Sequence, residues 1–141
     1  MILEDRVYDE IQQHCEKGDE YVSSRNFDKA IEEYKKALKI IPEPKTEWET
    51  STWVYCALGD VYYMKDEYDV ALDYLFEVLK CPEGLGNPFV CLRLGQCFYE
   101  KGNIDKAKDY FLQAYMLEGT DIFEDEDEKY LACIEQLIQE E

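Results

Sequence analysis

Small residues recur along this chain at fixed intervals, and this spacing marks it as a tandem repeat. The intervals of 12 and then 7 residues occur three times, in the sets Gly18, Ala30 and Ala37; Gly59, Ala71 and Val78; and Gly95, Ala107 and Ala114. Self-similarity at such a period is typical of arrays in which each unit buries its apolar face against its neighbours. An array of helix pairs also leaves a curved groove, so we expect the chain to bind another molecule.

Aromatic residues keep the same register as the small ones. Three positions after each glycine the chain holds Tyr21, Tyr62 and Phe98. A small residue at a helix crossing lets two helix axes approach closely, and large rings beside it fill the flanking grooves. The turn positions that favour a positive φ hold Arg25, Asp66 and Gly102. The pattern predicts helices near residues 3–24, 27–41, 46–65, 68–80, 87–101, 104–117 and 123–139.

These features resemble the tetratricopeptide repeat (TPR) family, whose unit is about 34 residues of helix, turn and helix. The resemblance implies an all-α fold, a right-handed superhelical array of antiparallel helix pairs, in a single domain over residues 1–141. It places the repeats at about 11–44, 52–85 and 88–121, followed by a capping helix at about 123–139.

The resemblance also implies a concave groove, lined mainly by the first helix of each repeat. Carried over to this chain, the groove residues are Gln12 and Asp19; Trp53, Asp60, Tyr63 and Met64; and Phe89, Arg93, Gln96 and Tyr99. Aromatic faces beside carboxylates can hold a lysine or arginine through cation–π contact and a charge-assisted hydrogen bond. Alternatively, some of these aromatic side chains pack on other parts of the chain or on a second copy, so self-association is possible.

A well-known TPR subtype captures acidic C-termini of heat-shock chaperones with a set of Lys, Asn and Arg side chains. At the corresponding positions this chain has Cys15, Asp19, Ala57, Phe89 and Arg93, of which only Arg93 matches. Because Asp19 would repel a carboxylate, we predict that the chain does not bind such tails.

The charge of the chain is strongly negative. The net charge is −18, and residues 118–141 hold ten acidic residues against Lys129. We expect the acidic run at residues 124–128 to be solvated at the start of the capping helix, where carboxylates meet the positive end of the helix dipole. Contacts to phosphates need Lys and Arg, so we expect no direct nucleic-acid binding. The charge favours a basic protein partner, attracted by electrostatic steering.

Residues suited to catalysis or metal binding are few. The six cysteines lack paired spacing and are expected to be reduced thiols that act as small apolar side chains. The single histidine, His14, is expected to be a buried packing residue. Without a Cys-x-x-Cys pair or a glycine-rich phosphate loop, we expect no enzyme activity, no cofactor and no metal. The sequence has no apolar run of membrane-spanning length and no signal-peptide pattern, so we expect no membrane contact and a cytoplasmic location.

Two binding functions remain open. The first is an inhibitor, such as an immunity protein that neutralises a basic toxin or effector domain. The second is a chaperone or adaptor that holds an extended peptide segment of a partner protein. Fold alone does not choose between them, because repeat arrays of one kind carry many unrelated functions.

Overall fold

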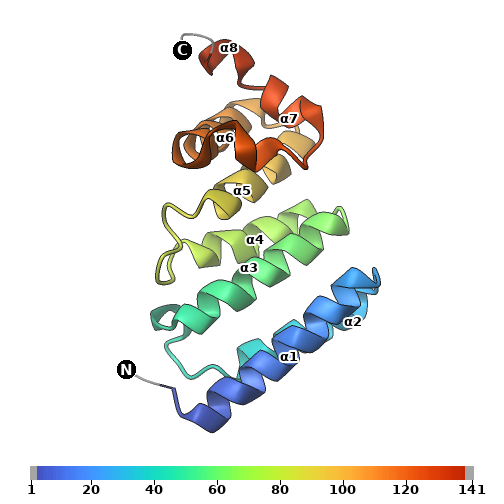
Figure 1. Cartoon of the computed structure of the whole chain (residues 1–141), viewed down its shortest axis with the longest axis vertical. Coiled ribbons are helices and arrows are strands. Elements are labelled where there is room, and N and C mark those ends of the chain that lie inside the picture. Colours follow the sequence, from blue (N-terminus) through green and yellow to red (C-terminus); the bar gives the residue numbers. More distant parts are fainter. Residues whose placement is uncertain (1–2, 139–141) are drawn as a thin grey trace. The chain divides into compact units, whose positions relative to one another are not determined.

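A computed structural model describes residues 3–138, and this part of the chain is helical, with no strand (Figure 1). The prediction of an all-α fold is confirmed. The residues group into two compact units, which divide between Leu85 and Gly86. Unit 1 holds α1 (Asp5–Ser23), α2 (Phe27–Ile40), η1 (Lys45–Glu47), α3 (Glu49–Met64) and α4 (Tyr68–Val78). Unit 2 holds α5 (Pro88–Glu100), α6 (Ile104–Glu118), η2 (Gly119–Phe123), α7 (Glu128–Ala132) and α8 (Glu135–Ile138). That residues 1–141 form a single domain stays a prediction.

The turns inside the three helix pairs share one hydrogen-bonding pattern. The backbone φ is +60° at Arg25, +63° at Asp66 and +86° at Gly102, so the predicted turn positions are confirmed. Directly after these residues, three backbone N–H groups reach back over the helix end, from Asn26 to Tyr21, from Glu67 to Tyr62 and from Asn103 to Phe98, at 2.8–2.9 Å. This six-residue closure satisfies carbonyls that a helix end otherwise leaves free. The same local geometry therefore ends the first helix of α1–α2, α3–α4 and α5–α6.

Within each pair the two helices touch at the glycine. A Cβ atom added to Gly18 would lie 2.5 Å from the Tyr34 ring, and one on Gly95 would lie 2.6 Å from the Phe111 ring. At Gly59 the clash would be with Leu75, at 2.7 Å. Such distances leave no room for a methyl group, because protein interiors are packed as densely as organic crystals. The spacing recognised in the sequence is therefore the spacing of helix crossings.

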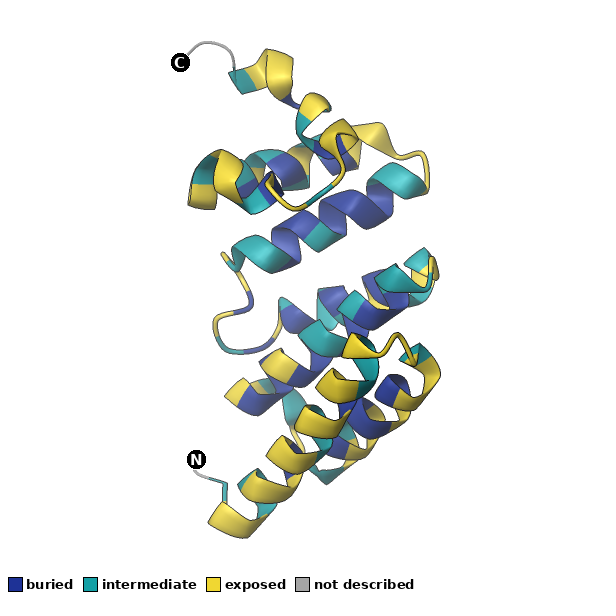
Figure 2. Ribbon diagram, turned by 45° about the vertical axis from the view of Figure 1, so that its right-hand side comes forward, coloured by how far each residue is buried: buried dark blue, intermediate teal, exposed yellow. Residues whose placement is uncertain are grey.

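The core of each unit follows from this packing. In unit 1 the fully buried apolar side chains include Ile11, Val54, Leu58, Leu75 and Val78. In unit 2 they include Leu92, Leu94, Phe111 and Ile134. Figure 2 shows α5 buried along most of its length, whereas much of α1 is exposed. In unit 2 the Phe111 ring lies 5.8 Å from Phe123 and 5.7 Å from Tyr130, so the C-terminal segment completes this core.

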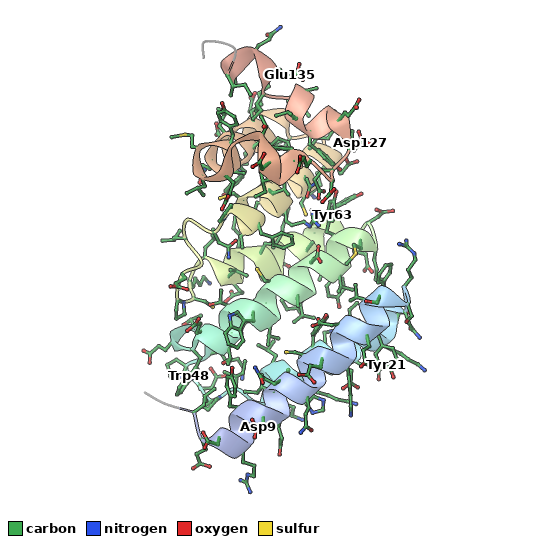
Figure 3. All side chains as sticks on the ribbon, in the orientation of Figure 1. Asp9, Tyr21, Trp48, Tyr63, Asp127 and Glu135 are labelled. Carbon is green, nitrogen blue, oxygen red and sulfur yellow. The ribbon has the colours of Figure 1, made fainter. Side chains whose placement is uncertain are left out.

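The predicted capping helix is divided in the structure. In place of one helix over residues 123–139 there are η2, α7 and α8, and residue 139 lies outside the described residues. The division has a local cause at Asp127, which Figure 3 labels. Its side chain accepts a hydrogen bond of 3.0 Å from the Lys129 backbone N–H and so starts a new helix at Glu128. Aspartate favours such caps over helix interiors, because its short side chain competes for backbone N–H groups.

The helix predicted over residues 46–65 begins later than expected. The 3-10 helix η1 comes first, and Trp48 separates it from α3. The Trp48 indole Nε1 donates a hydrogen bond of 2.9 Å to the Pro42 carbonyl, and the side chain is buried. This residue therefore anchors the connection between the first two helix pairs of unit 1.

Among the described cysteines, Cys81, Cys91 and Cys97 are buried thiols, and the reduced state of the six cysteines stays a prediction. Burial raises the pKa of Cys97 to about 12, so this thiol stays protonated at neutral pH. Within residues 3–138 no helix combines the length and apolarity that a bilayer crossing requires.

His14 is not the buried packing residue that we expected. Its side chain is 25% exposed, and Nδ1 lies 2.9 Å from the Glu33 Oε1 atom on α2. The ionised carboxylate can only accept, so Nδ1 carries the proton. Lys36 Nζ lies 3.1 Å from the other oxygen of Glu33. The imidazole therefore links α1 to α2 by a polar contact at the edge of the core.

Glu33→Gln tests this link by its pH dependence. The hydrogen bond from His14, followed by that from Lys36, holds the pKa of Glu33 below its usual value of 4.5. A carboxyl whose pKa is lower in the folded state stabilises the fold above its unfolded pKa, and this stabilisation is lost as the pH falls through the folded pKa. We expect Glu33→Gln to cost about 1 kcal/mol at pH 7. Urea unfolding at pH 7 and pH 3 should show the difference between wild type and variant shrinking in acid; a difference independent of pH would refute the link.

Candidate functional site

A surface groove runs between α1 and α3 in unit 1. It has a volume of about 290 Å³, and we call it the α1–α3 groove. It is lined by Ile11, Gln12, Cys15, Glu16, Asp19, Tyr34, Trp53 and Ala57. Three of the predicted site residues, Gln12, Asp19 and Trp53, therefore lie around one groove.

Asp19 is held in place from the second helix of its own pair. The Tyr34 hydroxyl donates a hydrogen bond of 2.5 Å to Asp19 Oδ1, while Asp19 itself stays exposed. Burial of Tyr34, and then Asp19 itself, raise the pKa of this phenol, so it remains a donor at neutral pH. The groove thus presents a carboxylate whose orientation is set by the fold.

Trp53 is the exposed aromatic side chain of the groove lining, with 43% of its surface accessible. The Tyr8 ring stands edge-on to it, with centroids 6.3 Å apart and an angle of 71° between the planes. The Tyr8 hydroxyl in turn accepts a hydrogen bond of 2.9 Å from Gln12 Nε2. An exposed, laterally supported tryptophan is the kind of side chain that anchors protein interfaces.

The lining of the α1–α3 groove is acidic. It includes the carboxylates of Glu16 and Asp19 and no Lys, Arg or His among the residues that the structure describes. Burial, followed by the charges of Asp19 and Glu16, raises the pKa of Cys15 to about 11. A thiol is nucleophilic as its thiolate, so Cys15 is an inert part of the wall at neutral pH.

The other predicted residues of unit 1 lie further along α3. Asp60, Tyr63 and Met64 are half-buried and are not part of the groove lining. The charge of Asp60 contributes to the raised pKa of Tyr34, which places it near the same phenol. The Tyr63 ring, labelled in Figure 3, lies 6.0 Å from the Tyr68 ring of α4.

In unit 2 the predicted residues lie on α5, and three of them, Arg93, Gln96 and Tyr99, contact the C-terminal segment. Gln96 is fully buried instead of lining an exposed wall. Its Nε2 donates a hydrogen bond of 2.6 Å to Glu126 Oε1, and its Oε1 accepts one of 2.6 Å from Arg93. The same Arg93 nitrogen lies 3.1 Å from Glu126, and the guanidinium lies 4.7 Å from the Phe89 ring centroid. The carboxylate of Glu126 therefore ties this cluster together.

Tyr99 is engaged in the same way. Its ring stands edge-on to Tyr130 at 5.4 Å, and Lys129 Nζ lies 5.6 Å from its centroid. Glu100 Oε2 accepts a hydrogen bond of 2.8 Å from the Tyr130 hydroxyl. The same oxygen forms an ion pair with Lys129 Nζ at 2.9 Å. Residues 126–130 thus contact the face of α5 that was predicted to line a groove.

Sequence reasoning missed Glu126, Lys129 and Tyr130 as contacts of α5. The acidic run was expected to be solvated, and its other four members are exposed, but Glu126 is half-buried. One signal was available, since Arg93 is the single basic residue among the predicted groove positions and the acidic run follows it in the same chain. Among residues 3–138, no group of three or more His, Cys, Asp and Glu is arranged to hold a metal ion.

Comparisons with known proteins agree with the helix-pair geometry. Two family models, each described as a tetratricopeptide repeat, match residues 14–44 and residues 88–121, the latter being the range predicted for the third repeat. A comparison with curated proteins finds no match.

Several solved structures share the fold. The C-terminal TPR-containing domain of a Plasmodium falciparum FK506-binding protein matches with a TM-score of 0.75 at 21% identity, over 98% of this chain and 95% of that one. The first TPR of Spaghetti (RPAP3), bound to the HSP90 peptide SRMEEVD, has a TM-score of 0.71 at 15% identity, over 93% and 92% of the two chains. The Yersinia enterocolitica type III secretion chaperone SycD was solved in complex with a peptide of the translocator YopD. It has a TM-score of 0.72 at 14% identity, over 94% of this chain and 96% of that one.

Repeats of this kind form protein-binding modules, since stacked helix pairs expose an extended surface. The two matched repeats, the shared turn geometry of the three helix pairs and the glycine crossings identify the chain as a tetratricopeptide repeat protein.

Proposed function

We propose that this chain is a non-catalytic module that binds a basic segment of a partner protein and thereby inhibits it, as an immunity-type protein would. The α1–α3 groove carries this proposal, because an exposed tryptophan stands there beside an oriented carboxylate and the described lining residues include no basic side chain. Gln12, Asp19 and Trp53 make the first contacts, and Asp60, Tyr63 and Met64 extend them along α3. For Tyr99 of unit 2 to take part, Lys129 and Tyr130 would have to leave its ring.

The chemistry of the groove fits a lysine or arginine of the partner. A cation over the Trp53 ring gains from the electron-rich face, and Asp19 accepts a charge-assisted hydrogen bond from the same group. The Tyr34 hydroxyl fixes Asp19 beforehand, so little side-chain freedom is lost on binding. The net charge of −18 steers a basic surface toward the protein and speeds association.

An inhibitory role is proposed because basic protein surfaces commonly bind nucleic acids, and covering such a surface prevents that binding. Proteins that act on nucleic acids contact phosphates through Lys and Arg, and an acidic module that covers these residues blocks the contact. A toxin or effector domain of this type is therefore the partner that we favour, in the cytoplasm, with no membrane and no cofactor involved.

Binding of acidic tails is not part of this proposal. The TPR of Spaghetti was solved with the HSP90 peptide SRMEEVD, whose sequence is acidic. In this chain Glu16 and Asp19 would repel such a peptide, and Arg93 is paired with Glu126. A micromolar complex with SRMEEVD would contradict the proposal.

A chaperone or adaptor role is the second candidate. The likeness to SycD, solved with a peptide of YopD, and the exposed ring of Trp53 support it. In that case an extended apolar segment would occupy the groove, and its affinity would depend on the aromatic side chains more than on charge. Self-association through the same side chains would appear in sedimentation at several protein concentrations.

Salt dependence and a charge-matched pair of variants separate the two candidates. The partner is first isolated by affinity capture at low salt. Its affinity is then measured at about 0.05 and about 0.5 M NaCl, because the screening length for charges is severalfold shorter at the higher concentration. For an electrostatic inhibitor we expect Asp19→Asn to weaken binding about fivefold and Trp53→Ala about tenfold or more. Glu20→Gln removes one exposed charge from the same helix outside the groove lining and should change affinity less than about twofold.

An affinity that persists in molar salt and responds to Trp53→Ala but not to Asp19→Asn would favour the chaperone role. Equal effects of Asp19→Asn and Glu20→Gln would remove the α1–α3 groove from the proposal.

A further inference from the structure

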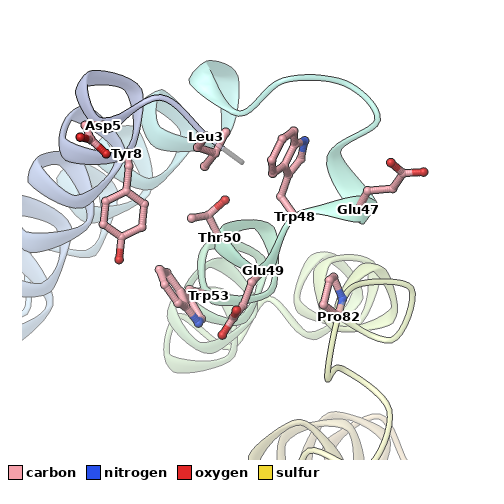
Figure 4. Close-up of a pocket in the computed structure, with 9 residues that line it drawn as sticks. All are labelled: Leu3, Asp5, Tyr8, Glu47, Trp48, Glu49, Thr50, Trp53 and Pro82. Carbon is pink, nitrogen blue, oxygen red and sulfur yellow. The ribbon is translucent and has the colours of Figure 1, made fainter. Parts of the chain in front are cut away.

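A second pocket of unit 1 lies at the start of α3 (Figure 4). It has a volume of about 630 Å³ and is lined by Leu3, Asp5, Tyr8, Glu47, Trp48, Glu49, Thr50, Trp53 and Pro82. Of these described residues only Trp53 also lines the α1–α3 groove. We propose that this pocket, called here the Thr50 pocket, binds the protonated primary amine of a lysine side chain from another protein.

Aromatic side chains form the walls. Figure 4 shows Thr50 between Trp48 on one side and Tyr8 and Trp53 on the other. Both tryptophans are fixed, Trp48 by its hydrogen bond to Pro42 and Trp53 by the edge of Tyr8. Aromatic faces attract an ammonium group, and the pocket also offers Leu3 and Pro82 to the aliphatic stem that carries it.

The charge of the lining selects a cation. Asp5, Glu47 and Glu49 are exposed carboxylates, and the described lining holds no Lys, Arg or His. The N-terminus of α3 adds a positive potential to the pocket, since a helix start carries a partial positive charge of about half an elementary charge. Three carboxylates outweigh this partial charge, so the net field in the pocket is negative.

Thr50 identifies the kind of cation. The residue is only 4% exposed, and its Oγ1 has no hydrogen-bond partner among the described residues. Buried hydroxyl groups are nearly always hydrogen-bonded, so an unpaired one that lines a pocket indicates a missing partner. A primary ammonium has N–H donors for this oxygen, whereas a trimethylated amine has the same charge and none.

Lysine fits this arrangement better than arginine. The lysine ammonium is a compact charge on a flexible apolar stem, and arginine is suited to two parallel hydrogen bonds to one carboxylate. Here the unpaired hydroxyl is that of Thr50, buried in the wall of the pocket, and the three carboxylates are exposed. This site goes beyond the proposed function, because it can be occupied whether or not the α1–α3 groove binds a partner.

Capped Gly-Gly-X-Gly-Gly peptides test the assignment on the full chain. With X as lysine we expect shifts of the Trp48 and Trp53 indole N–H signals in NMR titration. Acetyl-lysine, which lacks the charge, should give none, and trimethyllysine and arginine should bind about fivefold more weakly than lysine. Binding of acetyl-lysine as tight as that of lysine would overturn the proposal, and tighter binding of arginine would overturn the choice of lysine.

The chain supplies a matched pair of variants. Ser51 Oγ is also buried without a described partner, but Ser51 does not line the pocket. Thr50→Val should weaken the lysine peptide about fivefold and leave trimethyllysine unchanged, while Ser51→Ala should leave both unchanged. An unchanged affinity of Thr50→Val for lysine would overturn the role of the hydroxyl.

Two further variants keep the test clear. If Thr50→Val does not fold, Glu49→Gln changes an exposed side chain of the same pocket and should weaken lysine about threefold. Asp19→Asn should leave the Trp48 shift unchanged, so failure of the α1–α3 groove and failure of this site are distinguishable.

Discussion

Phe111→Ala is expected to lower the free energy of unfolding by about 3–5 kcal/mol, a large part of the stability of a domain this size. Phe111 is fully buried in unit 2. Its ring fills the space that Gly95 leaves on α5 and contacts the rings of Phe123 and Tyr130. Truncation therefore opens a cavity between α5, α6 and the C-terminal segment at once.

Urea unfolding monitored by circular dichroism measures this effect. Met116→Ala is the matched control, because Met116 lies on the same helix and is 81% exposed. We expect the control to change stability by less than about 0.5 kcal/mol. A loss below about 1 kcal/mol for Phe111→Ala would mean that the ring is not the centre of this core.

Glu126→Ala is the second variant with a large expected effect, about 2–3 kcal/mol. Removing this carboxylate takes away the acceptor of the buried Gln96 amide and the ion pair that Glu126 forms with Arg93. Side chains in this cluster are largely shielded from water, so solvent replaces the lost contacts only in part. The cost is thus that of unpaired buried polar groups as well as that of one ion pair.

Glu124→Ala provides the control for this variant. Glu124 belongs to the same acidic run and is exposed, so both variants change the net charge equally. Thermal unfolding of the two variants distinguishes loss of the specific Glu126 contacts from the general effect of removing one negative charge from the acidic run. If the two variants unfold together, the contact between residues 126–130 and α5 contributes nothing measurable.

The regular part of the fold could be predicted because its determinants are local and repeated. Gly18, Gly59 and Gly95 mark helix crossings in the sequence and in the structure, and Arg25, Asp66 and Gly102 take the left-handed conformation where the register required it. Each of these positions is fixed by close packing or by a turn within about 20 residues, so one sequence was sufficient.

Only in unit 1 do predicted site residues come together around a groove, and their role in binding stays a prediction. Gln12, Asp19 and Trp53 follow the repeat register and meet around one groove. The burial of Gln96 depends instead on Glu126, a residue outside the repeats that reaches α5 through a non-helical stretch. The repeat spacing does not predict contacts made by residues outside the repeats. For the same reason it did not predict that the capping helix is interrupted at Asp127.

The carboxylate of Glu126 acts as an intramolecular, tethered ligand of Arg93. Because chain connectivity holds it beside Arg93, it acts at an effective concentration of the order of millimolar. A free acidic peptide would have to exceed that value, or bind far more tightly, to displace it. We therefore expect anionic peptides well below that concentration to leave the Arg93–Glu126 pair of unit 2 intact.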